Sequence, residues 1–384
     1  MSGDDTIERC VGQPGTPPRV MLLYWGRRGA LSRFTYELGR TALANAGLRA
    51  TISVSRQNES FDSFVEFHDA LFPIDTFAHD YGAVANAWRI VALRQSLVAR
   101  LKRDRTQAVV ALMPHVWMPL VAPVIKRAGV RFVSVIHDAD AHSGDPTKVV
   151  HGWGLRELDH ADLVLTLSSA VAGRLEATGR VPRAKLRTLF HPDLSYGPIS
   201  DPQPPAPGEP FRLLSLGRIL PYKGLPLLLD ALDIVRAQGL PVKLGVFGEG
   251  RLDHVVGRLK AMDAEVVNRW LTEDEIGGLT RRFHAVVLSH IDASQSGVAA
   301  TALGGGIPII STPVGGLPEQ VGHGRNGLVA ENADAKSLAA AITQLYNDPQ
   351  LYRTLCTNIS VTREQRSMRR FVDELTAAAV GVCQ

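Results

Sequence analysis

The sequence predicts an α/β protein built as two domains, each with a parallel sheet, that face each other across a cleft. Three observations predict this class. The chain has 384 residues, more than one ordinary hydrophobic core organises. Short apolar runs alternate with helical patterns, which is typical of parallel sheets covered by helices on both faces. A proline-rich segment divides this alternation into two halves.

The first domain is expected to cover residues 1–196. Residues 1–19 are polar, contain proline and glycine, and lack the apolar stretch of a signal peptide, so a disordered lead-in is expected. A helix is expected at 31–46, after the first strand and its loop. The strands of this domain are expected at 19–24, 50–54, 108–112, 131–136, 163–167 and 185–190.

The domain boundary is predicted at 197–210, where six prolines make a stiff, extended linker. The second domain is expected at 211–361, and residues 362–384 are expected to form a C-terminal helix, with the helical pattern over 362–380. The strands of the second domain are expected at 211–216, 243–247, 265–268, 285–288, 308–311 and 327–330. Ligands of such sheets bind beyond the carboxyl ends of the strands.

Composition narrows the class of protein further. No run of 18 apolar residues occurs, so no transmembrane helix is expected. The three cysteines are scattered and odd in number, which favours a reduced, cytoplasmic setting. The first 200 residues hold 24 Lys/Arg against 19 Asp/Glu, and the remainder holds 18 against 19. A basic first half hints at an acidic partner such as a membrane surface or a phosphorylated lipid, whereas nucleic acid fits less well.

The turn after the strand 211–216 reads GRILPYKG over residues 217–224. Gly217 allows a tight turn, Arg218 offers a forked donor to phosphate oxygens, and Lys223 offers a point charge. A surface turn with two solvated cations would give the same pattern.

A second segment, DASQSG at 292–297, begins a helix of small residues whose first turn contains Gly297, Val298 and Ala299. Free backbone N–H groups and the helix dipole favour phosphate at such a start. Combined with two nearby cations, this helix start predicts a pyrophosphate site.

These two segments resemble the retaining, nucleotide-sugar-dependent glycosyltransferases of the GT-B fold, family 4, also called glycosyl transferases group 1. The resemblance is good over the second half of the chain and loose over the first. It implies two Rossmann-like domains, a C-terminal helix at 362–384 that crosses back to the first domain, and the transfer of a sugar from a nucleoside diphosphate. In that family the residues matching Arg218 and Lys223 neutralise the leaving diphosphate, and the histidine matching His137 hydrogen-bonds the transferred sugar.

The resemblance also implies contacts to the donor from three loops. The loop GRRG at 26–29 would approach donor phosphate or acceptor through Gly26 and Gly29, with an exposed cationic loop as the alternative. The turn containing Gly248 and Glu249 would lie under the nucleotide, although a plain strand-to-helix turn reads the same. Further along, either Arg269 or Trp270 would cover one face of the base, and a core position is the alternative for the tryptophan.

The chain departs from this family where two glutamates separated by seven residues are usual. Thr301 occupies the second glutamate position and Ala293 the first, with Asp292 beside it. Thr301 can hydrogen-bond to the ribose but not as a bidentate carboxylate. The sequence is similar to a subgroup with Ser-Gln-Ser-Gly here, where neutral polar groups stand in place of carboxylates: Ser294, Gln295 and Ser296.

Other features have alternative interpretations. Residues 89–105 form a basic amphipathic pattern that could lie on an anionic bilayer, and a surface helix with its apolar stripe in the core is the favoured alternative. The phenylalanines of 61–81 indicate either a mobile acceptor-side segment or packed structure. His115 is a candidate for the acceptor side, Gly315 and Gly316 are expected to allow close packing, and Glu319 is expected to have a structural role at a helix start.

The expected function is therefore a glycosyltransferase that acts with retention on a hydroxyl of a glycan or lipid-linked acceptor, in bacterial surface or exopolysaccharide synthesis. No cofactor and no metal is expected beyond the nucleotide-sugar donor, with UDP ahead of GDP. The expected location is cytoplasmic, with peripheral contact to an anionic membrane and no nucleic acid partner. The alternative is a non-catalytic GT-B protein that binds a nucleotide or a partner, which the missing glutamates favour.

Overall fold

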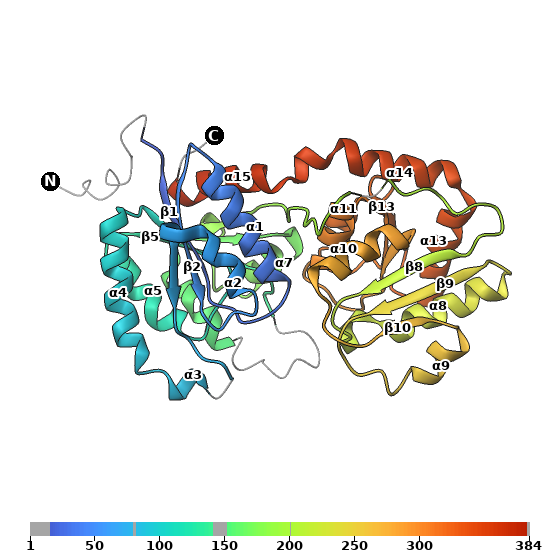
Figure 1. Ribbon diagram of the computed structural model, residues 1–384, viewed down its shortest axis with the longest axis horizontal. Coiled ribbons are helices and arrows are strands. Elements are labelled where there is room, and N and C mark those ends of the chain that lie inside the picture. The colour runs from blue at the N-terminus through green and yellow to red at the C-terminus, as the bar shows by residue number, and fades with distance from the viewer. Residues whose placement is uncertain (1–15, 80–81, 141–151, 200, 382–384) are drawn as a thin grey trace.

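The computed structural model describes residues 16–79, 82–140, 152–199 and 201–381. These residues form two α/β lobes joined by two crossing connections (Figure 1). The expected lead-in falls mostly outside them, as do two of the cysteines. Cys356 is free. None of the helices in the described part of the chain is long and apolar enough to cross a membrane.

The first lobe contains a seven-stranded parallel sheet in the order β3-β2-β1-β4-β5-β6-β7. Its strands are β1 (Arg19–Tyr24), β2 (Arg49–Ser55), β3 (Leu71–Ile74), β4 (Ala108–Ala111), β5 (Arg131–Ile136), β6 (Leu163–Thr166) and β7 (Leu186–Thr188). The six expected strands are confirmed, and β3 was missed. Its sequence LFPI contains a proline, which suits only an edge strand, and β3 is an edge of this sheet.

The second lobe contains a six-stranded parallel sheet in the order β10-β9-β8-β11-β12-β13. Its strands are β8 (Phe211–Leu216), β9 (Val242–Phe247), β10 (Glu265–Val267), β11 (Ala285–Leu288), β12 (Ile309–Ser311) and β13 (Gly327–Val329). All six were expected. The prediction of an α/β protein with two parallel sheets is confirmed.

Helices cover both sheets. The first lobe has α1 (Ala30–Ala44), α2 (Phe61–Phe64), α3 (Gly82–Ala85), α4 (Arg89–Asp104), α5 (Met118–Arg127) and α7 (Ser169–Ala177). The remaining helices are α8 (Leu225–Ala237), α9 (Val256–Ala261), α10 (Glu273–Arg282), α11 (Gly297–Gly305), α12 (Leu317–Val321), α13 (Ala335–Asn347), α14 (Pro349–Val361) and α15 (Met368–Val380).

The strand orders indicate where a ligand is expected to bind. In the first sheet the strands before β4 are added on one side of β1 and the later strands on the other, so the strand order reverses between β1 and β4. In the second sheet it reverses between β8 and β11. Ligands of doubly wound sheets bind outside the carboxyl ends of the strands at such a switch point. The loops that leave these strands are therefore 25–29, 112–117, 217–224 and 289–296, and three of them hold the motifs singled out above.

The last helix returns to the first lobe. Phe371, Val372 and Leu375 of α15 are buried in the same core cluster as Val20 of β1 and Phe34 of α1, and Figure 1 shows α14 and α15 running along both lobes. The expected start of this helix at 362 is wrong. Residues 363–366 form a separate 3₁₀ turn, and α15 begins after Ser367, whose side chain accepts a hydrogen bond from the N–H of Arg370.

Two ambiguous segments are packed structure. Along α4, the apolar stripe Ile90, Leu93, Leu97 and Leu101 is buried, so this stripe lies in the core and is not available to a bilayer. In the phenylalanine-rich segment, Phe64 and Phe67 are buried and form a cluster with Tyr36. The interpretation of that segment as a mobile acceptor-side element is therefore wrong for its described part, while residues 80–81 lie outside the described residues.

Candidate functional site

Lys223 lies against the first turn of α11. Gly217 leaves β8 with φ 96°, and a Cβ on it would lie 3.4 Å from Lys223 Nζ and 3.2 Å from Val298 Cγ2. The lysine ends a 3₁₀ turn, Pro221–Lys223, that closes at Gly224 in a left-handed conformation. The ammonium is thereby directed back over the glycine toward the start of the helix.

The charge of this lysine is unfavourable in the protein. Burial and then the neighbouring Arg218 lower the pKa of Lys223 to about 8. Within the described residues neither side chain forms an ion pair with a carboxylate. Two adjacent cations that the protein does not neutralise make this turn a place where an anion would be strongly favoured.

Glycines bring the site loops into backbone contact. Gly248 has φ 142°, and a Cβ there would lie 2.1 Å from the carbonyl oxygen of Gly217. Gly224 has φ 65°, and a Cβ there would lie 2.0 Å from the carbonyl oxygen of Ser289. These glycines are required because any side chain would separate the loops that follow β8, β9 and β11.

The start of α11 is organised by Ser296, which the sequence analysis singled out, and by Gln320, which it did not. Ser296 Oγ accepts a hydrogen bond from the N–H of Ala299 (3.3 Å). The side-chain amide of Gln320 makes two hydrogen bonds to the backbone of Ser296. It accepts from the N–H of Ser296 (2.7 Å) and donates to the carbonyl of Ser296 (3.2 Å). The N–H of Ala299 is thus already used, and it does not face a phosphate as expected. The N–H groups of Gly297 and Val298 have no partner among the described residues.

Side chains at and beside the altered glutamate positions are engaged within the protein. Thr301 is buried, and its hydroxyl donates to the carbonyl of Gly297 (2.9 Å). Asp292 accepts a hydrogen bond from Arg174 of α7 (3.3 Å), so its carboxylate is directed at the first lobe. Neither residue presents the acceptor groups to a ribose or sugar that its position in the sequence indicated.

His137 and Gln295 meet across the two lobes. His137 Nε2 lies 2.8 Å from the carbonyl of Leu112, which can only accept, so this nitrogen carries the proton. Burial lowers the pKa of His137, and the neutral ring then presents the Nδ1 lone pair to Gln295 Nε2, 2.5 Å away. Both ring nitrogens are therefore engaged by the protein, and a sugar would reach Nδ1 only by displacing Gln295.

The loop 26–29 lies near the start of α11. A Cβ on Gly297 would lie 3.4 Å from Ala30 Cβ, so α1 and α11 begin close to each other. Gly26 is packed on the ring of Tyr24, and the N–H of Gly29 donates to Glu59 Oε1 (2.8 Å). The N–H of Gly29, which was expected to approach a phosphate, thus already donates to the carboxylate of Glu59.

The expected base side is formed by the loops after β9 and β10. The amide of Asn268 makes two hydrogen bonds of 3.0 Å to the backbone of Gly250, which joins the two loops. Glu249 is exposed beside them. Arg269 pairs with Glu275 (2.9 Å). Trp270 is 44% exposed, so the alternative that it is a core residue is wrong.

His115 is a packed residue. It is buried between the rings of Trp25, Phe77 and Trp117, and its Nδ1 accepts a hydrogen bond from the N–H of Trp117 (3.2 Å). Burial lowers the pKa of His115 to about 3. This surrounding gives the ring a role in packing.

Further contacts between the lobes were not expected from the sequence. Glu319 accepts hydrogen bonds from the N–H groups of Ser169 (2.9 Å) and Ala170 (3.2 Å), at the start of α7. Ser168 Oγ donates to the carbonyl of Ser294 (3.0 Å). A carboxylate at a helix start suggested a local role for Glu319 on α12, whereas it contacts a helix of the other lobe.

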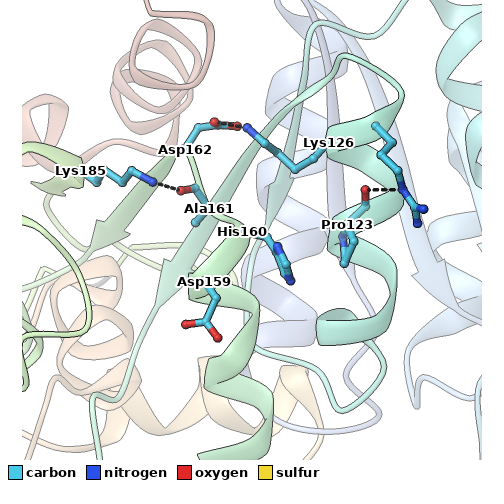
Figure 2. A pocket seen from close by; sticks show the side chains of 8 residues that line it. Pro123, Lys126, Asp159, His160, Ala161, Asp162 and Lys185 are labelled. Atoms are coloured by element: carbon cyan, nitrogen blue, oxygen red, sulfur yellow. Dashed lines mark hydrogen bonds and ion pairs between the residues drawn. The ribbon is translucent and has the colours of Figure 1, made fainter.

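A cavity of about 500 Å³ lies elsewhere, at the amino ends of β6 and β7 (Figure 2). Its cations are already bound by the chain, since Lys126 pairs with Asp162 and Lys185 donates to the carbonyl of Ala161 (3.0 Å). It lies at the opposite edge of the sheet from the switch point and takes no part in the candidate site.

Solved structures share this architecture over nearly the whole chain. HepE of Anabaena in complex with UDP-glucose is 17% identical, with a TM-score of 0.68 over 95% of this chain and all of that one. The lipopolysaccharide outer core galactosyltransferase WaaB is 14% identical, also with a TM-score of 0.68, over 95% of this chain and all of that one. The chain has the GT-B fold. At these identities the similarity shows the fold alone.

Sequence comparisons support glycosyl transferases group 1 for the second lobe. Residues 210–348 match the model of that family. The putative colanic acid biosynthesis glycosyltransferase WcaL of Salmonella typhimurium is 26% identical over 48% of this chain and 47% of its own length. The amylovoran biosynthesis glycosyltransferase AmsK of Erwinia amylovora is 27% identical over 36% of each. The chain spans about half the length, or less, of these curated relatives.

Proposed function

We propose that the chain is a retaining glycosyltransferase that moves a sugar from a nucleoside diphosphate to a hydroxyl of a glycan or lipid-linked acceptor. One observation carries this proposal. The ammonium of Lys223 lies over Gly217 and against the first turn of α11, with Arg218 as its charged neighbour. Two cations and free helix N–H groups are the donors that a diphosphate leaving group requires.

In the proposed reaction, the bond between the anomeric carbon and the diphosphate breaks, and its electrons stay on a phosphate oxygen. The acceptor oxygen attacks from the face that the diphosphate leaves, and its proton passes to the departing phosphate. Arg218, Lys223 and the N–H groups of Gly297 and Val298 would stabilise the growing negative charge. A double displacement would need a carboxylate at the sugar. The carboxylate beside the altered glutamate position, on Asp292, is directed at Arg174.

A sugar that displaces Gln295 from Nδ1 of His137 would contact both residues. The carboxamide of Gln295 replaces the carboxylate usual in the family, and its Nε2 is already committed to His137.

The choice of donor and acceptor rests on related proteins. HepE was crystallised with UDP and with UDP-glucose, which supports UDP ahead of GDP as the nucleotide. WcaL and AmsK are named for colanic acid and amylovoran biosynthesis, which supports an acceptor in bacterial polysaccharide synthesis. The proposed location is the cytoplasm, at the inner face of the membrane, with no cofactor and no nucleic acid partner.

The test is nucleotide binding by calorimetry and thermal shift with UDP, GDP and ADP, followed by assays of sugar-nucleotide hydrolysis. The double variant Arg218→Ala/Lys223→Ala should lose both binding and hydrolysis. Arg251→Ala/Lys260→Ala removes two exposed cations from the same lobe and is the matched control. If no nucleotide binds the unmodified chain, the proposal is wrong and a non-catalytic GT-B protein is the better description.

A further inference from the structure

One face of the first lobe carries exposed apolar side chains. Val84 is 83% exposed, Trp88 70% and Val91 60%, and all three belong to α3 or to the start of α4. Isolated exposed apolar residues are normal on protein surfaces, whereas a group of large ones indicates an interaction site. Figure 1 shows α3 and α4 on the outer side of the first lobe, away from the second.

Hydrogen bonds join α3 and α4 to the segment 116–120, and that segment to Trp153. The indole of Trp153 donates to the carbonyl of Val116 (2.7 Å), and Arg94 of α4 donates to the carbonyl of Leu120 (3.0 Å). Trp153 is 40% exposed and Leu120 38%. We refer to these exposed apolar residues as the aromatic–basic face: Val84, Trp88, Val91, Leu120 and Trp153.

The charge around this face is mainly positive, although Asp104 pairs with Arg100 and Arg103 and Asp162 pairs with Lys126. Residues 82–103 and 114–128 contain no aspartate or glutamate, whereas the first range contains four arginines and a lysine. The guanidinium of Arg89 lies 5.5 Å from the centre of the Trp88 ring, and that of Arg156 lies 5.9 Å from the Trp153 ring. Tryptophan beside arginine is suited to the boundary between lipid headgroups and acyl chains.

The position of the face fits the proposed reaction. Val84 and Trp88 follow the carboxyl end of β3, and residues 116–120 follow the carboxyl end of β4. Substrates of such a sheet bind beyond this same edge. A membrane in contact here would bring a lipid-linked acceptor to the edge of the sheet at which His137 lies.

We propose that the aromatic–basic face is the surface by which the chain docks on a bilayer containing anionic phospholipid. The apolar side chains enter the headgroup region, and Arg89 and Arg156, which lie beside the two tryptophans, bind lipid phosphates. The buried stripe of α4 stays in the core, so the contact is shallow and reversible. This proposal deepens the proposed function, because it names the surface that presents a lipid-linked acceptor.

The test is flotation of the full chain with vesicles of phosphatidylglycerol and phosphatidylethanolamine, compared with vesicles of phosphatidylcholine alone. We expect binding to the anionic vesicles that weakens as salt is raised. The triple variant Val84→Ser/Trp88→Ser/Val91→Ser should bind about tenfold more weakly or not at all. Val256→Ser/Val361→Ser removes exposed valines of 42% and 70% exposure from the second lobe, and this control should bind as the unmodified chain does.

Two outcomes would overturn the proposal. If the unmodified chain fails to float with anionic vesicles at low salt, a bilayer is not the partner, and a change in oligomeric state of the triple variant would then assign the face to protein contacts. If the triple variant floats as well as the unmodified chain, membrane contact belongs to another face. Since every changed residue is exposed, thermal melting should show all variants folded. The assay contains no nucleotide sugar, so its failure leaves the test of glycosyl transfer untouched.

Discussion

Replacing Lys223 by methionine should stabilise the protein while abolishing its binding of a nucleoside diphosphate. The lysine has a folded-state pKa of about 8 against an ordinary value of 10.5. The charged ammonium is therefore less stable in the folded protein than in the unfolded chain. At about 1.36 kcal/mol for each pH unit, this difference corresponds to about 3 kcal/mol. Water still reaches part of the half-buried side chain, and we therefore expect a gain of about 2 kcal/mol at pH 7.

The pH dependence of this gain tests its cause. Between pH 8 and 10.5 the unfolded chain binds more protons at this position than the folded chain does, so the unmodified protein becomes more stable as pH rises through this window. The advantage of Lys223→Met should therefore be full below pH 8 and fall to about half at pH 9.5.

Urea denaturation without nucleotide, at pH 7 and at pH 9.5, measures both quantities. Lys260→Met replaces an exposed lysine of the same lobe, and it should change the free energy of unfolding by less than about 0.5 kcal/mol. A variant that is less stable than the unmodified protein at pH 7, or equally stabilised at both pH values, would refute the reasoning that the site stores an unfavourable charge for an anionic ligand.

Three further predictions concern the loops around this lysine. Gly224→Ala would place a methyl group 2.0 Å from the carbonyl of Ser289 at φ 65°, and it should lower the free energy of unfolding by about 2–4 kcal/mol, measured by urea denaturation. Gln295→Glu should raise the pKa of His137, because a carboxylate favours a proton on Nδ1. Titration of the imidazole by NMR checks this, and an unchanged pKa would contradict the contact. Glu319→Gln should weaken the hold on the start of α7 and increase the radius of gyration measured by X-ray scattering, whereas Glu331→Gln on an exposed loop should not.

Most strands could be predicted because a buried parallel strand is a short apolar run, and such runs are visible without any knowledge of their neighbours. The exception, β3, contains a proline and lies at an edge, where only its partner strand reveals it. The start of α15 was predicted too early, because the helical pattern continues through 362–366, and only the cap at Ser367 separates the two segments.

The parts of the candidate site whose positions depend on the backbone could be predicted from the sequence. Gly217 and the start of α11 come together because both follow carboxyl ends of neighbouring strands, which is a property of the sheet order. Side-chain directions could not be predicted in the same way. Asp292 and Thr301 stand at positions that suggest ligand contacts. In the structure, however, Asp292 pairs with Arg174, and the hydroxyl of Thr301 donates to the carbonyl of Gly297 in its own helix. Such pairings depend on residues far away in the sequence.

The engagement of His137 by Gln295 illustrates the same limit. The sequence placed each residue at the carboxyl end of its own sheet, and it could not indicate that the two lobes bring them within 2.5 Å. Glu59, which occupies the N–H of Gly29, was likewise invisible because nothing in its local sequence marks it as a partner of that loop.

The glycine contacts determine how the proposed glycosyltransferase could acquire a new donor. Gly217, Gly224 and Gly248 have no side chain and contact the neighbouring loops closely. Any side chain added at one of these positions would meet a carbonyl group or another site residue. Evolution therefore cannot change these positions in small steps. Variation in donor choice must instead come from side chains that border the stacked loops. Glu249 and Trp270 are exposed there, and Gln295 faces the other lobe. A library that randomises these three positions and leaves the glycines intact would explore donor preference without dismantling the phosphate site.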